Sequence, residues 1–234
     1  MKKTLFSMGA AAVTISMLVT GCASSGTHGE VAEKYEEFKV AVAQRPPAFV
    51  RTGERALDDV GILSAEVYDS TIKYLDEYVK ATENNRYYIG FMNDSVEYAK
   101  KKSVPLAQAM NAVLKQYRED DAAAAPEEKV YPRVVDGFKA IEALKPANKL
   151  KELAPIVAQA AKVALQAKQV SDVVVKTYST INFKDIEGMK KKAVVTTALA
   201  KVLEQAAFNV RALDFLQDQY KRNQEMEQYM QDKK

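Results

Sequence analysis

The sequence predicts an all-α fold, an antiparallel multi-helix bundle with a long C-terminal helical hairpin. Two long stretches near the C-terminus repeat apolar or small residues in alternating steps of three and four, which is the period of one helix face. Glycine is scarce, with nine in 234 residues, and it is unfavourable inside helices. No run of alternating apolar and polar residues is long enough to indicate a sheet.

Four helices are predicted in the first half of the chain. Their expected spans are 30–44, 58–82, 87–101 and 103–118. Two prolines directly follow the first span, where a helix cannot continue. Ser103 is expected to be the N-cap of the fourth helix, with Pro105 in its first turn, because a serine hydroxyl accepts a bond from the free N–H groups there.

An alanine-rich stretch at 122–126, AAAAP, follows these helices. It is the best boundary between two subdomains, at 30–121 and 127–234, although the alanines could equally extend the preceding helix. A further helix is predicted from Glu127 to Leu144 and should be closed by Pro146.

The last third of the chain predicts two long helices joined by a turn-like segment at 182–188, which should form an antiparallel hairpin. The first apolar stripe comprises Leu150, Leu153, Val157, Ala160, Ala164, Ala167, Ser171, Val174, Tyr178 and Ile181. The second comprises Val195, Leu199, Val202, Ala206, Asn209, Leu213, Leu216 and Tyr220. Further apolar residues beside the stripes widen each face, which favours a bundle over an isolated coiled coil.

Four details of this hairpin are expected. The small residues at the centre of the first stripe should let the two helix axes approach closely. Asn209 is polar within its stripe, which can fix the register at some loss of stability. Pro155 should start or kink the first helix. The polar end of the chain, 217–234, is expected to project or fray.

The first residues of the chain have the layout of a secretory signal. Lys2 and Lys3 precede an uncharged, mainly apolar run from Leu5 to Val19, and small residues then lead to Cys22. The apolar run is shorter than the roughly 20 residues that span a bilayer. An N-terminal membrane helix or a buried core helix is the alternative interpretation.

The tetrapeptide Val19-Thr20-Gly21-Cys22 resembles the lipobox of bacterial lipoproteins. The resemblance implies that a signal peptide, 1–21, is removed and that Cys22, the only cysteine, carries diacylglycerol with fatty acids such as palmitate. Ala23 follows the cysteine. By the sorting rule of enteric bacteria, this favours the periplasmic side of the outer membrane over the inner membrane.

The mature chain would consist of a lipidated tether at 22–29 and a helical domain at 30–234, and it would be nearly neutral. Removing 1–21 takes Lys2 and Lys3 from the 34 basic residues and no residue from the 31 acidic ones, which leaves 32 basic residues. A neutral domain is a poor partner for nucleic acid, because affinity for phosphates needs a basic surface. We therefore expect no nucleic-acid partner.

The residues required for common catalytic and metal sites are missing from the predicted domain. His28, the only histidine, lies in the tether, so the domain can form no Ser-His or Cys-His pair and no HExxH zinc site. Acidic clusters at 58–59, 119–121 and 127–128 lie near predicted helix ends. The first and last suit helix N-termini, where capping, the helix dipole and solvation explain them. We expect no catalytic residue, no cofactor and no metal, and hence no enzyme.

Tyrosine is the least ordinary feature. Six of the 12 tyrosines fall between Tyr68 and Tyr98, and tyrosine is enriched at interfaces because it combines an apolar ring with a polar tip. The alternative is packing within the bundle core. The candidate partner or ligand contacts are Tyr74, Tyr78, Arg86, Tyr87 and Tyr88.

Two functions fit these features. The first is a membrane-anchored envelope lipoprotein that acts as a non-enzymatic interaction or scaffold protein and docks an envelope protein. The second is a carrier that binds a small apolar ligand or lipid within the bundle, for which the tyrosine-rich half is the better place because the alanine-rich seam leaves little room. The sequence does not predict an oligomeric state.

Overall fold

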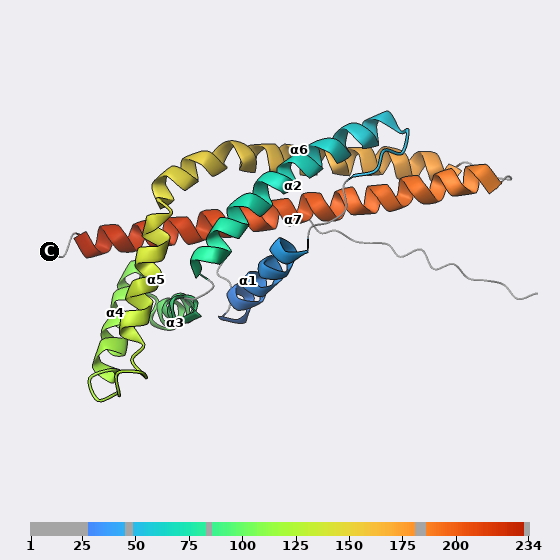
Figure 1. Ribbon diagram of the computed structural model, residues 1–234. Coiled ribbons are helices and arrows are strands. Elements are labelled where there is room, and N and C mark those ends of the chain that lie inside the picture. Colours follow the sequence, from blue (N-terminus) through green and yellow to red (C-terminus); the bar gives the residue numbers. More distant parts are fainter. Residues whose placement is uncertain (1–27, 45–48, 83–85, 181–185, 232–234) are drawn as a thin grey trace, which may run out of the picture.

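The computed structural model describes residues 28–44, 49–82, 86–180 and 186–231. Within these residues the chain forms seven helices and no strand, which confirms the predicted all-α class (Figure 1). The helices are α1 (His28–Ala43), α2 (Arg55–Thr82), α3 (Arg86–Lys102), α4 (Leu106–Asp120), α5 (Tyr131–Ala143), α6 (Pro146–Thr180) and α7 (Ile186–Gln231).

The longest helix, α7, runs the length of the molecule, and the other described helices are arranged along it (Figure 1). Helix α6 packs antiparallel to α7 and forms the predicted hairpin with it. Helix α2 lies across both and runs in the same direction as α7. Helices α3, α4 and α5 gather around the C-terminal half of α7, where α1 also packs against α2 and α3.

The predicted stripes of the hairpin are the buried faces of α6 and α7. Every member of the second stripe is buried, from Val195 to Tyr220. In the first stripe, the buried members are Leu153, Ala160, Ala164, Ala167, Val174 and Tyr178. The remaining described members are half-buried, and Ile181 lies outside the described residues. The predicted period therefore identified the correct faces.

Helix α5 begins at Tyr131, four residues after the predicted start. The carboxylate of Asp121 accepts hydrogen bonds from the backbone N–H groups of Val130 (2.9 Å) and Tyr131 (2.7 Å). It thus caps α5 from across the loop, because the first N–H groups of a helix have no partner within it. The cap of α5 therefore comes from the cluster at 119–121, and not from the acidic pair at 127–128 that the sequence predicts at its N-terminus.

Ser103 is not the N-cap of α4, contrary to the prediction. Its φ is 54°, and it directly follows α3 in the left-handed conformation that ends many helices. Pro105 occupies the N-cap position of α4 and forms no side-chain capping bond. Pro146 begins α6 rather than only closing α5, which suits a residue without an N–H group.

Pro155 lies inside α6, and Figure 1 shows that this helix bends toward its N-terminal, yellow end. A proline inside a helix removes one hydrogen bond and pushes against the preceding turn, so the predicted kink has a physical cause. Of the predicted breaks, the two prolines after the first helix, Pro46 and Pro47, and residues 182–185 of the hairpin turn lie outside the described part of the chain.

The polar end of α7 does not project at its beginning, contrary to the prediction for 217–234. Gln219, Tyr220, Arg222 and Asn223 are buried, because α2, α3, α4 and α5 surround this part of the helix. The hydrophobic core is continuous across the loop at 122–130, since residues on both sides of the loop belong to one cluster. The two predicted subdomains thus share a core.

We predict that two glycine-to-alanine changes have opposite effects on stability. A Cβ atom at Gly137 of α5 would overlap the Cβ atom of Tyr88 in α3, so Gly137→Ala should destabilise the protein by about 1–3 kcal/mol. At Gly90 of α3 a Cβ atom meets nothing within 4 Å. Gly90→Ala should therefore stabilise by up to about 1 kcal/mol. Urea unfolding measures both, and equal signs would contradict the packing of α5 on α3.

Candidate functional site

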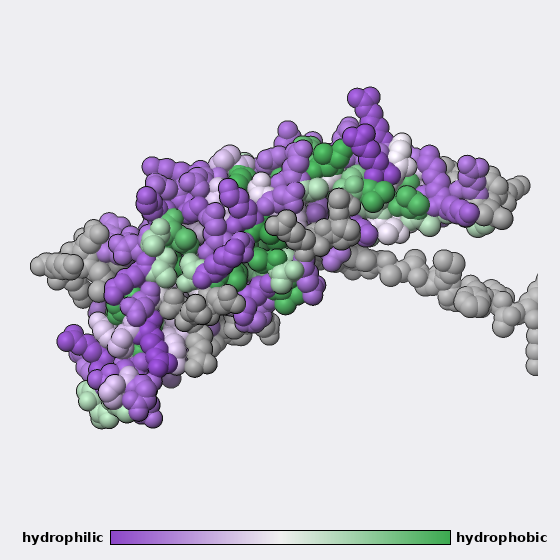
Figure 2. Space-filling view, in the orientation of Figure 1, coloured by the Kyte–Doolittle hydropathy of each residue, from purple (hydrophilic) through white to green (hydrophobic). Residues whose placement is uncertain are grey.

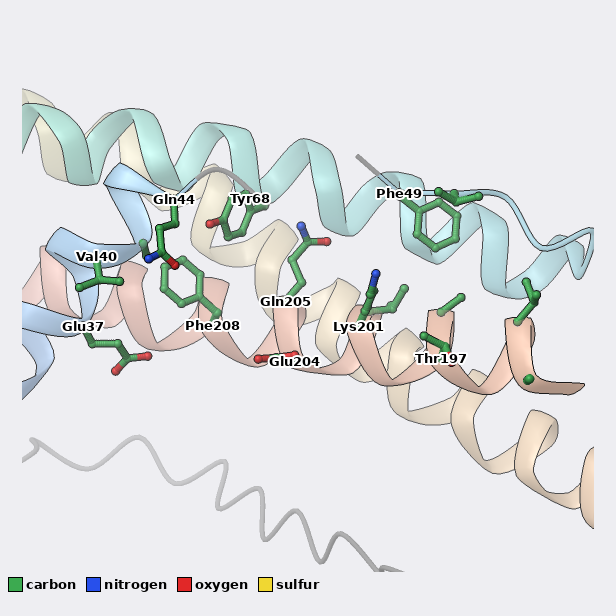
Figure 3. Close-up of a pocket in the computed structure, with 16 residues that line it drawn as sticks. Glu37, Val40, Gln44, Phe49, Tyr68, Thr197, Lys201, Glu204, Gln205 and Phe208 are labelled. Carbon is green, nitrogen blue, oxygen red and sulfur yellow. The ribbon is translucent and has the colours of Figure 1, made fainter. Parts of the chain in front are cut away.

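An open groove of about 800 Å³ lies between α1, α2 and α7 (Figure 3). Its long wall on α7 extends from Ala193 to Phe208, which is about 22 Å at about 1.5 Å per residue. The other walls come from the end of α1, from the segment before α2, and from Tyr68 of α2. The groove is therefore long and narrow, and it follows α7.

The groove is lined mainly by apolar side chains, and several of them are open to solvent. Val40, Val50 and Val194 line it and are 52%, 73% and 51% exposed. Figure 2 shows apolar atoms along the border between α2 and the N-terminal half of α7, among hydrophilic surroundings. Exposed apolar side chains that gather in one hollow, rather than being scattered, indicate a binding surface.

Aromatic rings form the inner end of the groove. The ring centroid of Phe208 lies 5.3 Å from that of Tyr68, in a tilted arrangement, and 5.8 Å from that of Phe38, in an edge arrangement. Phe38 also contacts Phe215, at 5.0 Å. Because Phe38 is fully buried, this end of the groove is continuous with the core and is held rigidly.

Phe49 reaches the groove because α2 has a glycine beneath it. A Cβ atom at Gly61 would overlap the ring of Phe49, so this ring can lie directly on the backbone of α2. Figure 3 shows Phe49 beside α2, at the end of the groove opposite Tyr68. A small residue in α2 thus creates the outer wall.

A turn at the start of α2 holds the segment that carries Phe49 and Val50. The carboxylate of Asp58 accepts hydrogen bonds from the N–H (2.7 Å) and hydroxyl (2.8 Å) of Thr52 and from the N–H of Gly53 (3.0 Å). Gly53 has a φ of 83°, which favours glycine. The predicted capping role of the acidic pair at 58–59 is therefore filled by Asp58.

The hydrogen bonds of this turn determine the protonation of Asp58. Burial alone would raise the pKa of its carboxyl, but the bonds from Thr52 and Gly53 stabilise the charged form and lower the pKa below its ordinary value. The carboxylate is therefore charged at neutral pH, and its contribution to the turn is available there.

Few charged groups line the groove. Lys201 and Gln205 extend from α7 toward α2, whereas Glu204 lies against the side of α7 (Figure 3). Glu37 of α1 is paired with Arg211, at 2.9 Å. Within the described part of the chain, neither Lys201 nor Glu204 has an ion pair, and both are exposed; of the two, Lys201 is the one whose side chain extends toward α2 across the groove (Figure 3).

The structure places Tyr78 and Tyr88 in the core rather than on a surface, which is the alternative that the sequence left open. Both are fully buried. Tyr78 donates to Oε1 of Gln219 and Tyr88 to Oδ1 of Asn223, each at 3.3 Å. Burial raises the pKa of both hydroxyls, so they remain neutral donors. Neither side chain is available to a partner at the surface.

Tyr74 and Tyr87 are half-buried and contact charged neighbours. The hydroxyl of Tyr74 donates to Glu152 at 3.2 Å, and Lys149 lies 5.0 Å from its ring centre. The guanidinium of Arg133 lies 4.7 Å from the ring centre of Tyr87. These contacts join α2 to α6 and α3 to α5. The remaining predicted site residues, Cys22 and the side chain of Arg86, lie outside the described residues.

The groove was not predicted from the sequence, and of the tyrosine-rich segment only Tyr68 lines it. Its residues come from three parts of the chain, at 37–50, at Tyr68 and at 193–208, and the last of these is far from the other two in sequence. The one local signal is Phe208. It is an apolar residue beside the second stripe, and the packing of α6 on α7 does not need it. Such a residue indicates another neighbour, but it does not say which.

No protein-family model matches this chain, and no curated protein and no solved structure matches it either. Among the described residues, no helix combines the length and the apolar character needed to cross a bilayer. In the same residues, no group of three or more histidine, cysteine, aspartate or glutamate side chains is placed to hold a metal ion. The features that bear on function are the N-terminal sequence and the groove.

We predict that Asp58→Ala destabilises the protein by about 1–2 kcal/mol at pH 7, because the turn loses its acceptor. The folded-state pKa of Asp58 is lowered, so this stability exists above the unfolded pKa of about 3.9 and is lost as the pH falls through the folded value. Urea unfolding at pH 7 and below pH 4 should show the difference from wild type shrinking.

The control is Asp59→Ala, which removes an exposed carboxylate from the same helix turn. It should change stability by less than about 0.5 kcal/mol at either pH. An effect of Asp58→Ala that is independent of pH would show that the charged carboxylate does not hold this turn.

Proposed function

We propose that this protein is a lipid-anchored envelope protein that acts as a non-enzymatic interaction or scaffold protein. The observation that carries the proposal is the succession of three features at the N-terminus of the sequence: a basic start, an uncharged apolar run and then Val19-Thr20-Gly21-Cys22. Five residues lie between Cys22 and His28, the first residue of α1, and a chain of that length reaches at most about 22 Å. The helical domain would therefore be held close to the membrane, on the periplasmic side of the outer membrane.

The outer face of the hairpin supports an interaction role. Leu165, Val173 and Val175 of α6 are large apolar residues, and each is more than half exposed. Val173 also lines a second, smaller hollow between α2 and α6. The three residues are spread over eleven positions and about 160° of the exposed side of α6, and a protein partner that packs along this side of the helix would cover them.

We predict that Cys22→Ala abolishes lipid attachment. Cells grown with an alkyne analogue of palmitate should incorporate the label into the wild-type protein and not into Cys22→Ala, and the variant should leave the membrane fraction or keep its uncleaved signal. Ala23→Ser, which keeps the cysteine, is the matched control and should remain labelled. Equal labelling of wild type and Cys22→Ala would refute the lipid anchor.

We predict a second result for the interaction role. A photo-crosslinking amino acid at Val173 should give a discrete protein adduct in intact cells, and the adduct should disappear when Cys22→Ala releases the protein from the membrane. The control is the same amino acid at Gln116, which is exposed on α4. If Leu165, Val173 and Val175 all give no more adduct than Gln116, this face is not a docking surface.

A carrier is the second candidate function, and the groove beside α7 favours it. Pockets for small molecules typically enclose about 300–1,000 Å³ and are lined mainly by apolar side chains with few polar groups. The groove, at about 800 Å³, has both properties. It lies between α1, α2 and α7, and of the tyrosine-rich segment, which is the better place for a ligand by sequence, it includes only Tyr68.

A further inference from the structure

We propose that the groove binds an amphipathic small molecule that has a linear apolar chain and an anionic head, and that Lys201 holds the head. The inference rests on the carrier function and specifies its ligand. The chain would run from Lys201 along α7 toward Val194, between α7 and the wall formed by Phe49 and Val50.

The dimensions of the groove fit a chain better than a helix. An α-helix with side chains is about 10–12 Å across, so one that matched the α7 wall in length would occupy roughly 2,000 Å³. The groove holds about 800 Å³. An extended hydrocarbon chain is far thinner and lies lengthwise in such a space.

The two ends of the groove differ in charge, and this sets the direction of the chain. Glu37 and Glu204 lie in the half toward α1. From Lys201 toward Ala193, no acidic side chain lines the groove, and the apolar residues include Val194, Phe49 and Val50. A chain of about 12 Å fits between Lys201 and Ala193. It would cover Val50 and Val194, which are otherwise exposed.

Lys201 is the group that distinguishes an anionic head from a neutral one. Its side chain reaches into the space between α7 and α2 (Figure 3), and no described acid is paired with it. An ammonium group beside an apolar wall attracts a carboxylate or a phosphate more strongly than it does in open water. Glu204, three residues further along α7, would repel the same head.

The test uses the absence of tryptophan from the chain. Val50→Trp places a fluorescent reporter in the groove, and Val175→Trp places a control reporter on the outer face of α6. The full chain, held in phosphatidylcholine vesicles, is titrated with decanoate, decyl phosphate, decanol and decyltrimethylammonium, which share one chain length. The Val50→Trp reporter should give a saturable blue shift with both anions, and the Val175→Trp reporter should not respond.

Charge variants then test the role of Lys201. Decanoate and decyl phosphate should bind at least fivefold more tightly than decanol, the tighter anion identifying the head. Lys201→Gln should remove this preference, and Lys201→Glu should favour decyltrimethylammonium. Glu204→Gln should tighten anion binding two- to threefold. Lys168→Gln, a control on α6 that is exposed and outside the groove, should change nothing.

The possible failures are distinguishable. Equal affinity for all four heads would overturn the anionic ligand and leave the carrier function standing. No saturable response of the Val50→Trp reporter to any probe would overturn both. A shift that depends on protein concentration without a probe would show that a second copy of the chain covers the groove, which also overturns the proposal.

Discussion

The continuous buried face of α7 is the constraint on which the rest of the structure depends. It extends from Val195 to Tyr220, about 38 Å along the helix axis. All six other described helices contact α7. Helices α2, α4, α5 and α6 pack beside it, whereas α1 and α3 reach it through side chains such as Phe38 and Tyr88. Ala160, Ala164 and Ala167 on the facing side of α6 are small, so the two helices pack closely and the other elements are placed around a fixed axis.

Polar side chains within this face set the register of the packing. Asn209 donates a hydrogen bond to the carbonyl oxygen of Ser64 in α2, at 3.1 Å, and both residues are buried. Gln219 and Asn223 accept bonds from Tyr78 and Tyr88 further along the helix. Sliding α7 by one turn would leave several of these groups buried without partners, and each such group costs about 1–3 kcal/mol. Tyrosines of the tyrosine-rich segment therefore help to fix the position of α7.

The hairpin could be predicted because its information is local: a face repeats every three or four residues within one helix. Contacts between distant residues could not be predicted in this way. Tyr78 and Gln219 are 141 positions apart, and a polar run such as 217–234 is usually solvated when it is considered alone. The start of α5 depends on Asp121 across a loop, and the groove depends on Phe49 lying over Gly61. None of these pairs has a periodic signature.

The position of the groove relative to the proposed anchor follows from the length of α1. This helix has 16 residues and is about 24 Å long, and its C-terminal residues line the groove. With the tether of at most about 22 Å, the near end of the groove would lie within about 45 Å of Cys22. If Cys22 is lipidated, an amphipathic molecule that leaves the bilayer would have a short path to the groove. The anchor and the groove would then lie at opposite ends of one short helix, so the anchor would keep the groove close to the membrane from which its ligand comes.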